Sequence, residues 1–313
     1  MTRRKRLLAA LGAAGLLALP APAQTPQTPT VTDDTGNVFA LKETPRRIVS
    51  LAPNITEILF ALGLGDRVVG VTRYCDYPPE ARAKDKIGGF IDPSVEKIRA
   101  LDPGLVVAFR GNPWEVLNRL KALKVPVFIL DIGERLEAVP ETIVKIGRVT
   151  RREEEARAIV ASLEAKLRAA LAEAARGSGR PRVFLNLAGK DLMTCGRSSY
   201  LHDLIVKAGG TNVAAGVPKT WSSYSREQLI RDDPDVVIIL APSAADFAAA
   251  REWFVRLPGL DSLRAVRSGQ VRFLDENAAS RVGPRLFDAF AELVKIIHGG
   301  RGGGRGPRPC LGI

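Results

Sequence analysis

The stretch Arg47–Gly70, RIVSLAPNITEILFALGLGDRVVG, decides how the first part of this chain folds. It reads as a buried strand, a short turn, a helix and a second strand, because apolar residues first run together and then recur at helical spacing. Asn54 and Glu57 have the spacing of a capping box at the helix start, and the glycines at 63 and 65 are expected to end the helix. The stretch therefore predicts a βαβ unit, the repeating element of a parallel sheet.

The same pattern recurs along the chain. Short apolar runs with strand character alternate with helical patterns, which is typical of parallel sheets covered by helices on both faces. The predicted strands are 48–51, 68–71, 105–109, 127–130, 183–187, 236–240 and 271–274. With 313 residues, the chain is long enough for two such α/β units.

One segment breaks the alternation. Residues 150–176 contain neither proline nor glycine, Thr150 and Glu153 have capping-box spacing, and Gly177 follows as a stop signal. At 1.5 Å per residue, this helix would be roughly 40 Å long. Its apolar stripe is predicted to be Ile159, Leu163, Leu167, Leu171 and Ala174. An ordinary surface helix is the alternative, but the alternation stops before this segment and resumes after it, which favours a bridge between two lobes.

The predicted fold class is therefore α/β, with two small doubly wound lobes on central parallel sheets, joined by one long bridging α-helix. The predicted divisions are a signal peptide at 1–23, a lead-in segment at 24–45, an N-terminal lobe at 46–149, the bridging helix at 150–177, a C-terminal lobe at 178–298, and a glycine- and arginine-rich disordered tail at 299–313. Open α/β sheets bind ligands beyond the carboxyl ends of their strands, so the predicted binding site is a cleft between the lobes.

The two ends of the chain bear on its location and charge. RRKR at 3–6, an apolar run at 7–19 and APA at 21–23 predict a secretory signal peptide, and the run is too short to span a bilayer. No cysteine follows for lipid attachment, so we expect a soluble periplasmic protein. We also expect this protein to be a monomer. Removing the four positive charges of the signal and the three of the tail from the formal net charge of +12 leaves +5, which argues against nucleic-acid binding.

The sequence offers little for catalysis. It has two histidines, His202 and His298, and neither a phosphate-binding glycine loop nor a nucleophile elbow. His202 is interpreted as a polar residue at a helix start, and His298 as a residue at a helix end, where a cation suits the dipole. Three cysteines without paired spacing do not indicate a zinc site. A secreted hydrolase or metal-dependent enzyme is the lesser alternative, as is an envelope interaction module using the basic tail.

Aromatic residues gather where a ligand is expected. YCDYPP at 74–79 follows the second predicted strand, FRGN at 109–112 follows the third, and WSSY at 221–224 precedes a helix of the second lobe. Flat rings together with an arginine suit a large, flat, partly charged ligand. The alternative for each ring is simple packing within its loop.

These segments, with SLAPNITE at 50–57, VEKIRALDPGLVVA at 95–108 and SREQL at 225–229, resemble a family of periplasmic binding proteins that hand cobalamin, haem or iron–siderophore complexes to ABC importers. The YxDYPP, AFRGN and WxxxSREQL patterns are most similar to the cobalamin-binding branch. The resemblance implies a non-catalytic protein with no cofactor of its own, which delivers a corrinoid to an inner-membrane permease and its cytoplasmic ATPase. A haem or iron–siderophore carrier is the alternative, with Tyr74 or Tyr224 as axial ligand to haem.

The resemblance also implies roles for single residues. Ligand contacts are expected at Pro53, Tyr74, Phe109, Met193, Trp221 and Arg281. Glu96 and Glu227, each early in a helix of one lobe, are expected to dock against arginines of the permease. Cys75 and Cys195 map to loops on the cleft side, where they either face the ligand or are small buried thiols.

Overall fold

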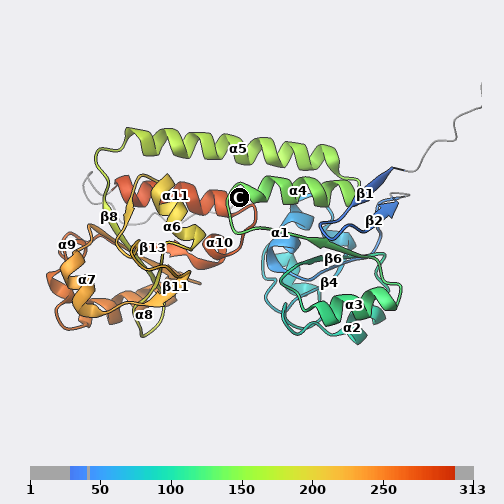
Figure 1. Ribbon diagram of the computed structural model, residues 1–313, viewed down its shortest axis with the longest axis horizontal. Helices are drawn as coiled ribbons and strands as arrows, with labels where there is room; N and C mark the ends of the chain where they lie inside the picture. Colours follow the sequence, from blue (N-terminus) through green and yellow to red (C-terminus); the bar gives the residue numbers. More distant parts are fainter. Residues whose placement is uncertain (1–28, 41–42, 300–313) are drawn as a thin grey trace, which may run out of the picture.

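The computed structural model describes residues 29–40 and 43–299, which form two α/β lobes beside one long helix, α5 (Glu153–Arg176) (Figure 1). The predicted signal peptide and nearly all of the predicted tail lie outside these residues. The 24 residues of α5 correspond to a length of about 36 Å. Within the described part of the chain, no helix is both long and apolar enough to cross a membrane.

The long helix begins three residues later than its sequence pattern indicates. Thr150 ends the preceding helix, α4 (Ala138–Val149), and its hydroxyl donates to the carbonyl of Ile146 at 2.6 Å. No side chain caps the start of α5. The predicted capping box of Thr150 with Glu153 is therefore wrong, because the preceding helix takes the Thr150 hydroxyl.

The N-terminal lobe is built on a five-stranded sheet in the order β5-β4-β3-β6-β7, in which every pair of strands is parallel. Its central strand, β3, is buried at every residue, as expected of a parallel strand with helices on both faces. The elements are β3 Ile48–Ser50, α1 Pro53–Ala61, β4 Val68–Val71, β5 Asp85–Lys86, α2 Val95–Ala100, β6 Leu105–Phe109, α3 Trp114–Ala122, β7 Val127–Leu130 and α4, with 3₁₀ turns at Gly65–Arg67 and Pro79–Ala83.

The helix α1 follows β3 as predicted, but it starts differently. Pro53 lies in its first turn, where a missing N–H costs nothing, and no side chain caps it. Asn54 and Glu57 instead turn toward the other lobe, where the Asn54 side-chain amide donates to the carbonyl of Val282 at 3.1 Å and Glu57 forms ion pairs. The predicted capping box is wrong, because distant partners take both side chains.

The C-terminal lobe carries a six-stranded sheet in the order β11-β9-β8-β12-β13, with β10 beside β8. The prediction of parallel strands is confirmed for β8, β12 and β13. The two-residue strand β10, parallel to β8, was not predicted, and β9 and β11 form antiparallel pairs at one edge. These two strands have three residues each, too few for a periodic pattern. The elements are β8 Arg182–Leu187, β9 Met193–Cys195, α6 Tyr200–Lys207, β10 Thr211–Asn212, β11 Trp221–Ser223, α7 Arg226–Asp232, β12 Val236–Ala241, α8 Ala244–Arg256, a 3₁₀ turn at Leu260–Ser262, α9 Arg264–Arg267, β13 Val271–Asp275, α10 Glu276–Ser280 and α11 Leu286–His298.

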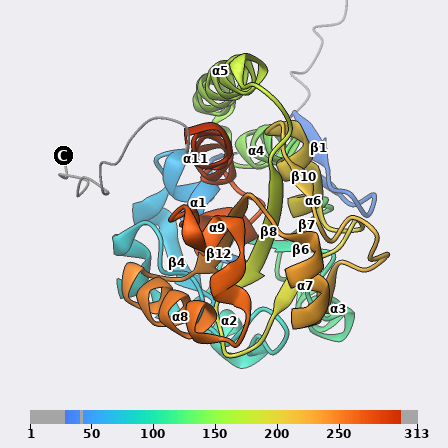
Figure 2. The ribbon, with the colours of Figure 1, turned by 90° about the vertical axis from the view of Figure 1, so that its left-hand side faces the viewer.

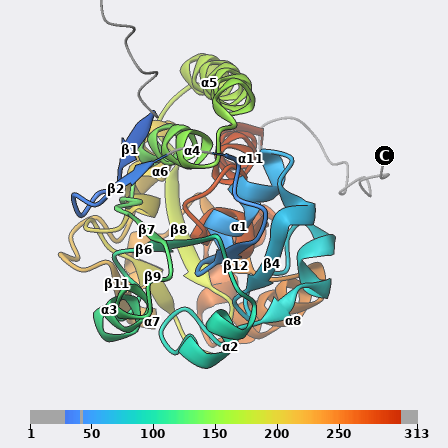
Figure 3. The ribbon, with the colours of Figure 1, turned by 90° about the vertical axis from the view of Figure 1, so that its right-hand side faces the viewer.

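One apolar layer joins the two lobes. Helix α5 packs on α4 from the N-terminal lobe and on α11 from the C-terminal lobe (Figures 2 and 3). Leu163 and Ala170 of α5 belong to one continuous buried cluster that reaches Ile48 in the first sheet and Val183 in the second. Leu171, predicted to lie on the buried stripe, is 39% exposed, and the neighbouring Ala170 is buried instead. The bridge is therefore packed along both lobes rather than free-standing.

The segment before the first predicted strand is more than a lead-in. Strands β1 (Thr30–Thr32) and β2 (Val38–Ala40) form an antiparallel hairpin beside the N-terminal sheet (Figure 3). In its turn, the Asp33 carboxylate accepts from the backbone amide of Ile129 in β7 at 3.2 Å, and the Asp34 amide donates to the carbonyl of Ile129 at 3.0 Å. The turn thus covers part of the otherwise open edge of β7.

Replacing Asp33 by alanine should lower the free energy of unfolding by about 1–3 kcal/mol at neutral pH. Asp33 is 4% exposed, and its carboxylate also accepts from the backbone amides of Thr35 and Asn37, each at 2.9 Å. Burial raises the pKa of this carboxyl, but hydrogen bonds from Asn37 and Thr35 outweigh it, so the pKa lies below its ordinary value.

The direction of the shift fixes the pH dependence. The stabilisation from Asp33 is fully present above its unfolded-state pKa of about 4 and is lost as the pH falls through the lower folded-state pKa. Urea unfolding of the wild type and Asp33→Ala should therefore differ most near neutral pH and converge in acid. Asp261→Ala, which removes an exposed carboxylate, is the control. A difference that stays constant down to about pH 2 would contradict the assignment.

Candidate functional site

The loops that follow the N-terminal strands expose a pair of aromatic rings. Tyr74 follows β4 and Phe90 lies in the loop before α2, with ring centroids 5.7 Å apart and exposures of 45% and 38%. Asn112, buried after β6, holds this loop, because its side-chain amide donates to the carbonyls of Phe90 at 2.8 Å and Leu51 at 3.1 Å. The pair is a well-supported apolar surface beyond the carboxyl ends of the strands, where open sheets bind ligands.

The structure brings three of the predicted ligand residues to this edge of the N-terminal sheet. Pro53, after β3, and Phe109, the last residue of β6, are both half-buried, and Tyr74 follows the neighbouring β4. The Phe109 ring lies against Gly111, where any Cβ would collide with it. Phe90 was not predicted, because a single phenylalanine in a glycine-containing loop carries no pattern of its own.

Two predicted residues lie at an edge of the C-terminal sheet. Met193 begins β9 and Trp221 begins the neighbouring β11, and the antiparallel register pairs Trp221 with Cys195 and Met193 with Ser223. Both Met193 and Trp221 are half-buried, and Trp221 packs against the main core. Each lobe therefore contributes its own set of predicted ligand residues.

Arg281, at the end of α10, reaches from the C-terminal lobe to the N-terminal lobe. Its Nη1 lies 2.5 Å from Oδ1 of Asp76 and 3.5 Å from Oε1 of Glu57, and its Nη2 donates to Asn277 at 2.7 Å. Burial raises the pKa of the Asp76 carboxyl, but Arg281 outweighs this effect and the pKa lies below its ordinary value. A ligand would meet an arginine that already has carboxylate partners.

Two other arginines in this region are also paired. Arg73, whose guanidinium lies 5.8 Å from the Tyr74 ring centroid, contacts Asp92 at 2.6 Å. Arg285 contacts Glu57 at 2.6 Å. The positive charges around the aromatic pair and the lobe contact are therefore balanced locally. A site whose arginines are already paired suits a ligand with a neutral, hydrogen-bonding periphery better than a strongly charged ligand.

Glu96 and Glu227 occupy equivalent places in the two lobes. Each is the second residue of a short helix, α2 or α7, that begins after a serine cap. Their side chains are 69% and 63% exposed, with Arg119 3.0 Å from Glu96 and Arg226 3.3 Å from Glu227. A backbone hydrogen bond at the helix start lowers the pKa of each carboxyl. Figure 1 shows α2 and α7 on the side of the lobes away from α5.

Cys75 and Cys195 are small buried thiols, which decides between the two alternatives. They are 1% and 0% exposed, and the Cys75 sulfur lies 3.1 Å from the hydroxyls of Thr56 and Thr72. Burial raises the pKa of both thiols, that of Cys195 to about 12. Neither is free to face a ligand.

In a Cys310→Ala variant, we expect no reaction of the native protein with a thiol-specific reagent, and reaction of both Cys75 and Cys195 after unfolding. A thiol must be exposed and ionised to react, and burial opposes both. Absorbance at the reagent wavelength with and without denaturant measures this. A cysteine that reacts in the native protein and is protected by ligand would place it in the binding site instead.

Tyr224, one of the two tyrosines suggested for binding haem iron, is partly buried and packs against the core of the C-terminal lobe. Its hydroxyl donates to Oδ2 of Asp232 at 2.5 Å, and its ring centroid lies 5.5 Å from that of Phe184. Burial and the Asp232 carboxylate raise its pKa. Tyr74 is thus the better placed of the two. Among the described residues, no group of three or more His, Cys, Asp or Glu side chains is placed to hold a metal ion directly.

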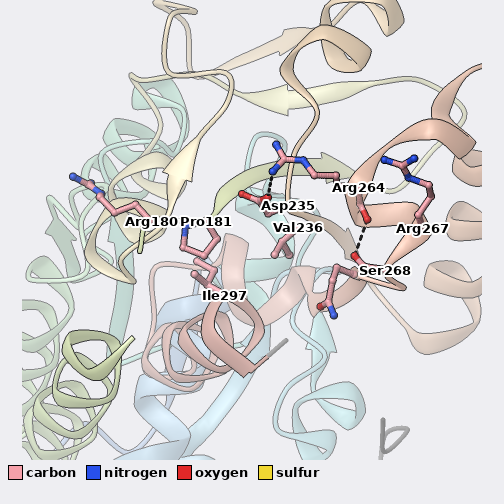
Figure 4. A pocket seen from close by; sticks show the side chains of 9 residues that line it. Arg180, Pro181, Asp235, Val236, Arg264, Arg267, Ser268 and Ile297 are labelled. Atoms are coloured by element: carbon pink, nitrogen blue, oxygen red, sulfur yellow. Dashed lines mark hydrogen bonds and ion pairs between the residues drawn. The ribbon is translucent and has the colours of Figure 1, made fainter. Parts of the chain in front are cut away.

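A cavity of about 550 Å³ lies at the opposite end of the C-terminal sheet (Figure 4). Pro181 and Asp235, which line it, immediately precede β8 and β12, so it lies at the amino ends of these strands. Arg264 in its wall is held by Asp233 and Asp235, each at 2.7 Å. Open sheets bind ligands at the other end, so we place the functional site at the carboxyl ends of the strands.

Comparisons with known proteins point in one direction. The model of the family described as "Periplasmic binding protein" matches residues 48–278. A vitamin B12-binding protein of Salmonella typhimurium is 32% identical over 254 residues, which are 80% of this chain and 90% of the relative. An uncharacterised ABC transporter substrate-binding lipoprotein of Bacillus subtilis is 29% identical over 86% of each chain. The solved apo structure of a periplasmic haem-binding protein from Roseiflexus sp. RS-1 aligns with a TM-score of 0.73 at 31% identity, over 82% of this chain and 98% of that one.

Proposed function

Because this chain belongs to the family of periplasmic binding proteins, we propose that it captures cobalamin or a related corrinoid between its two lobes and delivers it to an inner-membrane ABC transporter. The family consists of substrate-binding components of transport systems, so the protein is a binding protein and not an enzyme. Its fold, two α/β lobes with a long bridging helix, is that of its structural relatives, as the sequence predicts.

The observation that carries the choice of ligand is the exposed pair of Tyr74 and Phe90, set among arginines that already have carboxylate partners. A corrinoid offers a large ring system with a periphery of neutral amides, so it can pack on aromatic rings and form hydrogen bonds without an unpaired cation. The two propionates of haem would have to compete with Asp76 for Arg281. The similarity to a vitamin B12-binding protein supports the same choice.

Haem is the second candidate, and one feature of the site favours it. The Tyr74 side chain is 45% exposed, so its phenol oxygen can approach an iron atom of a bound ligand. The similarity to a haem-binding protein of the same fold supports this alternative.

Calorimetry and visible absorbance with cobalamin, cobinamide, haemin and a ferric siderophore test the proposal. We expect binding of cobalamin or cobinamide at micromolar concentrations or below, with haemin and the siderophore much weaker. Tyr74→Phe is the matched variant, because it keeps the ring but removes the oxygen that would bind iron. A Soret shift with haemin that Tyr74→Phe abolishes, and no heat with either corrinoid, would replace the corrinoid by haem.

We further propose how the protein meets its transporter. The exposed carboxylates of Glu96 and Glu227, one on each lobe and both away from α5, would pair with arginines on the periplasmic face of the permease. The protein would act as a monomer in the periplasm, after removal of the predicted signal peptide at 1–23. It would need no cofactor and no nucleic acid for this role.

A further inference from the structure

One carboxylate of the N-terminal lobe contacts two arginines of the C-terminal lobe. The Glu57 side chain on α1 is 2% exposed, and its two oxygens accept from Nε of Arg285 at 3.1 Å and from Nη2 of Arg285 at 2.6 Å. Nη1 of Arg281 lies 3.5 Å from the same carboxylate. The side chains of Arg281 and Arg285 are only 15% and 17% exposed. All three charges are therefore largely withdrawn from water.

The backbones of the two lobes also come close at this point. The Asn54 side-chain amide, one turn before Glu57, donates to the carbonyl of Val282 at 3.1 Å. Gly283 lies so near that a Cβ at this residue would be 3.2 Å from Cβ of Asn54. The Arg285 guanidinium stacks over the ring of Tyr77, in the N-terminal lobe, at 4.1 Å from its centroid. Helix α1 and the segment 281–285 thus fit closely together.

This contact connects the lobes directly, in addition to the long helix and to the ion pair of Glu137 with Lys207 at 3.0 Å. Helix α5 holds the lobes through α4 and α11, and Arg285 lies immediately before α11. Figure 1 shows α1 and α10 facing each other where the two lobes meet, on the same side of α5. A rotation of one lobe about α5 would therefore separate Glu57 from its arginines. Separating a buried ion pair is costly, because each charge is left without its partner.

We propose that Glu57 is a positioning residue of the binding site. Through Arg285 it sets the spacing of the two lobes, and through its contact with Arg281 it orients the Arg281 guanidinium for contact with the ligand. The forked contact with Arg285 uses both carboxylate oxygens, which permits one relative orientation of the two groups. The Arg281 guanidinium contacts both Glu57 and the more exposed Asp76, whose side chain is 41% exposed. The role of Arg281 rests on the proposed function, whereas the role of Arg285 in lobe spacing does not.

The lobe spacing can be measured without any ligand. Spin labels at Ala122→Cys in α3 and Ala249→Cys in α8 report the distance between exposed sites of the two lobes, in a full-length background carrying Cys310→Ala. The remaining cysteines are buried. We expect one narrow distance distribution for the parent protein. Glu57→Gln, which keeps the shape but removes the charge, should broaden the distribution and move it to longer distances.

A matched control separates lobe spacing from the loss of any partly buried ion pair. Asp34→Asn removes the carboxylate that contacts Lys145 at 2.6 Å within the N-terminal lobe, so it should leave the distance unchanged. Arg285→Lys keeps the positive charge but cannot form the fork, and should act in the same direction as Glu57→Gln with a smaller effect. It also serves as the test if Glu57→Gln does not fold.

Affinity then tests the positioning of Arg281. With cobalamin as the probe, Glu57→Gln should weaken binding by about tenfold or more, and Glu57→Gln combined with Arg281→Gln should bind no more weakly than Arg281→Gln alone, because Glu57 acts through Arg281. Unchanged distances in both Glu57→Gln and Arg285→Lys would overturn the proposal. Additive losses of affinity in the double variant would also overturn it. If the distances change as expected but the parent protein binds no corrinoid, the proposed function fails while the spacing role stands.

Discussion

Replacing Glu96 and Glu227 together by alanine should abolish ligand uptake by cells while the purified protein keeps its affinity for the ligand. The two carboxylates are exposed and lie near the starts of α2 and α7. Removing one partner of an ion pair at an interface leaves the other charge unpaired, so the complex is weakened. Losing both ion pairs removes the contact of each lobe with the permease, so complex formation should fall much further than after either single loss. Each single variant should reduce uptake only in part.

The measurement needs two readouts and a charge-matched control. Uptake of labelled cobalamin is followed in cells that carry the cognate transporter and only the variant binding protein, and affinity is measured by calorimetry. Glu154→Ala combined with Glu173→Ala removes two exposed carboxylates from α5, on the other side of the molecule, and should leave uptake unchanged. Normal uptake by the Glu96 and Glu227 double variant would refute the docking role. Loss of ligand affinity in that variant would show that the two residues act in the binding site instead.

Removing both rings of the exposed aromatic pair should weaken corrinoid binding by about 10–100-fold. Tyr74→Ala with Phe90→Ala deletes an apolar surface that is ordered before the ligand arrives, so the contact needs little further ordering. Because both residues are about 40% exposed, the stability of the protein should change little.

Calorimetric titration of the double variant with cobalamin or cobinamide measures the effect. Leu171→Ala, which removes an exposed apolar side chain from α5, is the control and should bind normally. Tyr74→Phe alone should also bind corrinoids normally, since it keeps the ring. If the double variant binds as tightly as the parent protein, the ligand does not rest on this surface.

Local patterns predicted most of the fold, for a physical reason. Strands buried on both faces must be continuous apolar runs, and such runs are visible in a single sequence: β7 has the same bounds, 127–130, in prediction and structure. The short strands were not predicted, because two or three residues show no period; they are β1, β2, β5, β9, β10 and β11. Two capping boxes were wrong because Thr150, Asn54 and Glu57 found other partners.

The candidate site depends on partners that are distant in the sequence. Arg281 was predicted as a ligand contact, but nothing near it in the sequence indicates that Asp76, 205 positions away, would share its charge. Glu57 and Arg285 are 228 positions apart. Ion pairs of this kind form only when both lobes are folded and in contact, so local sequence patterns do not predict them.

The apolar layer of α4, α5 and α11 has a consequence for how the protein becomes folded. Part of the surface that α5 must cover comes from α11, the last described helix of the chain. Helix α5 is therefore not fully covered until nearly the whole chain has been synthesised. For the same reason we expect the two lobes to melt together, as one cooperative unit in a calorimetric scan, although their sheets are separate.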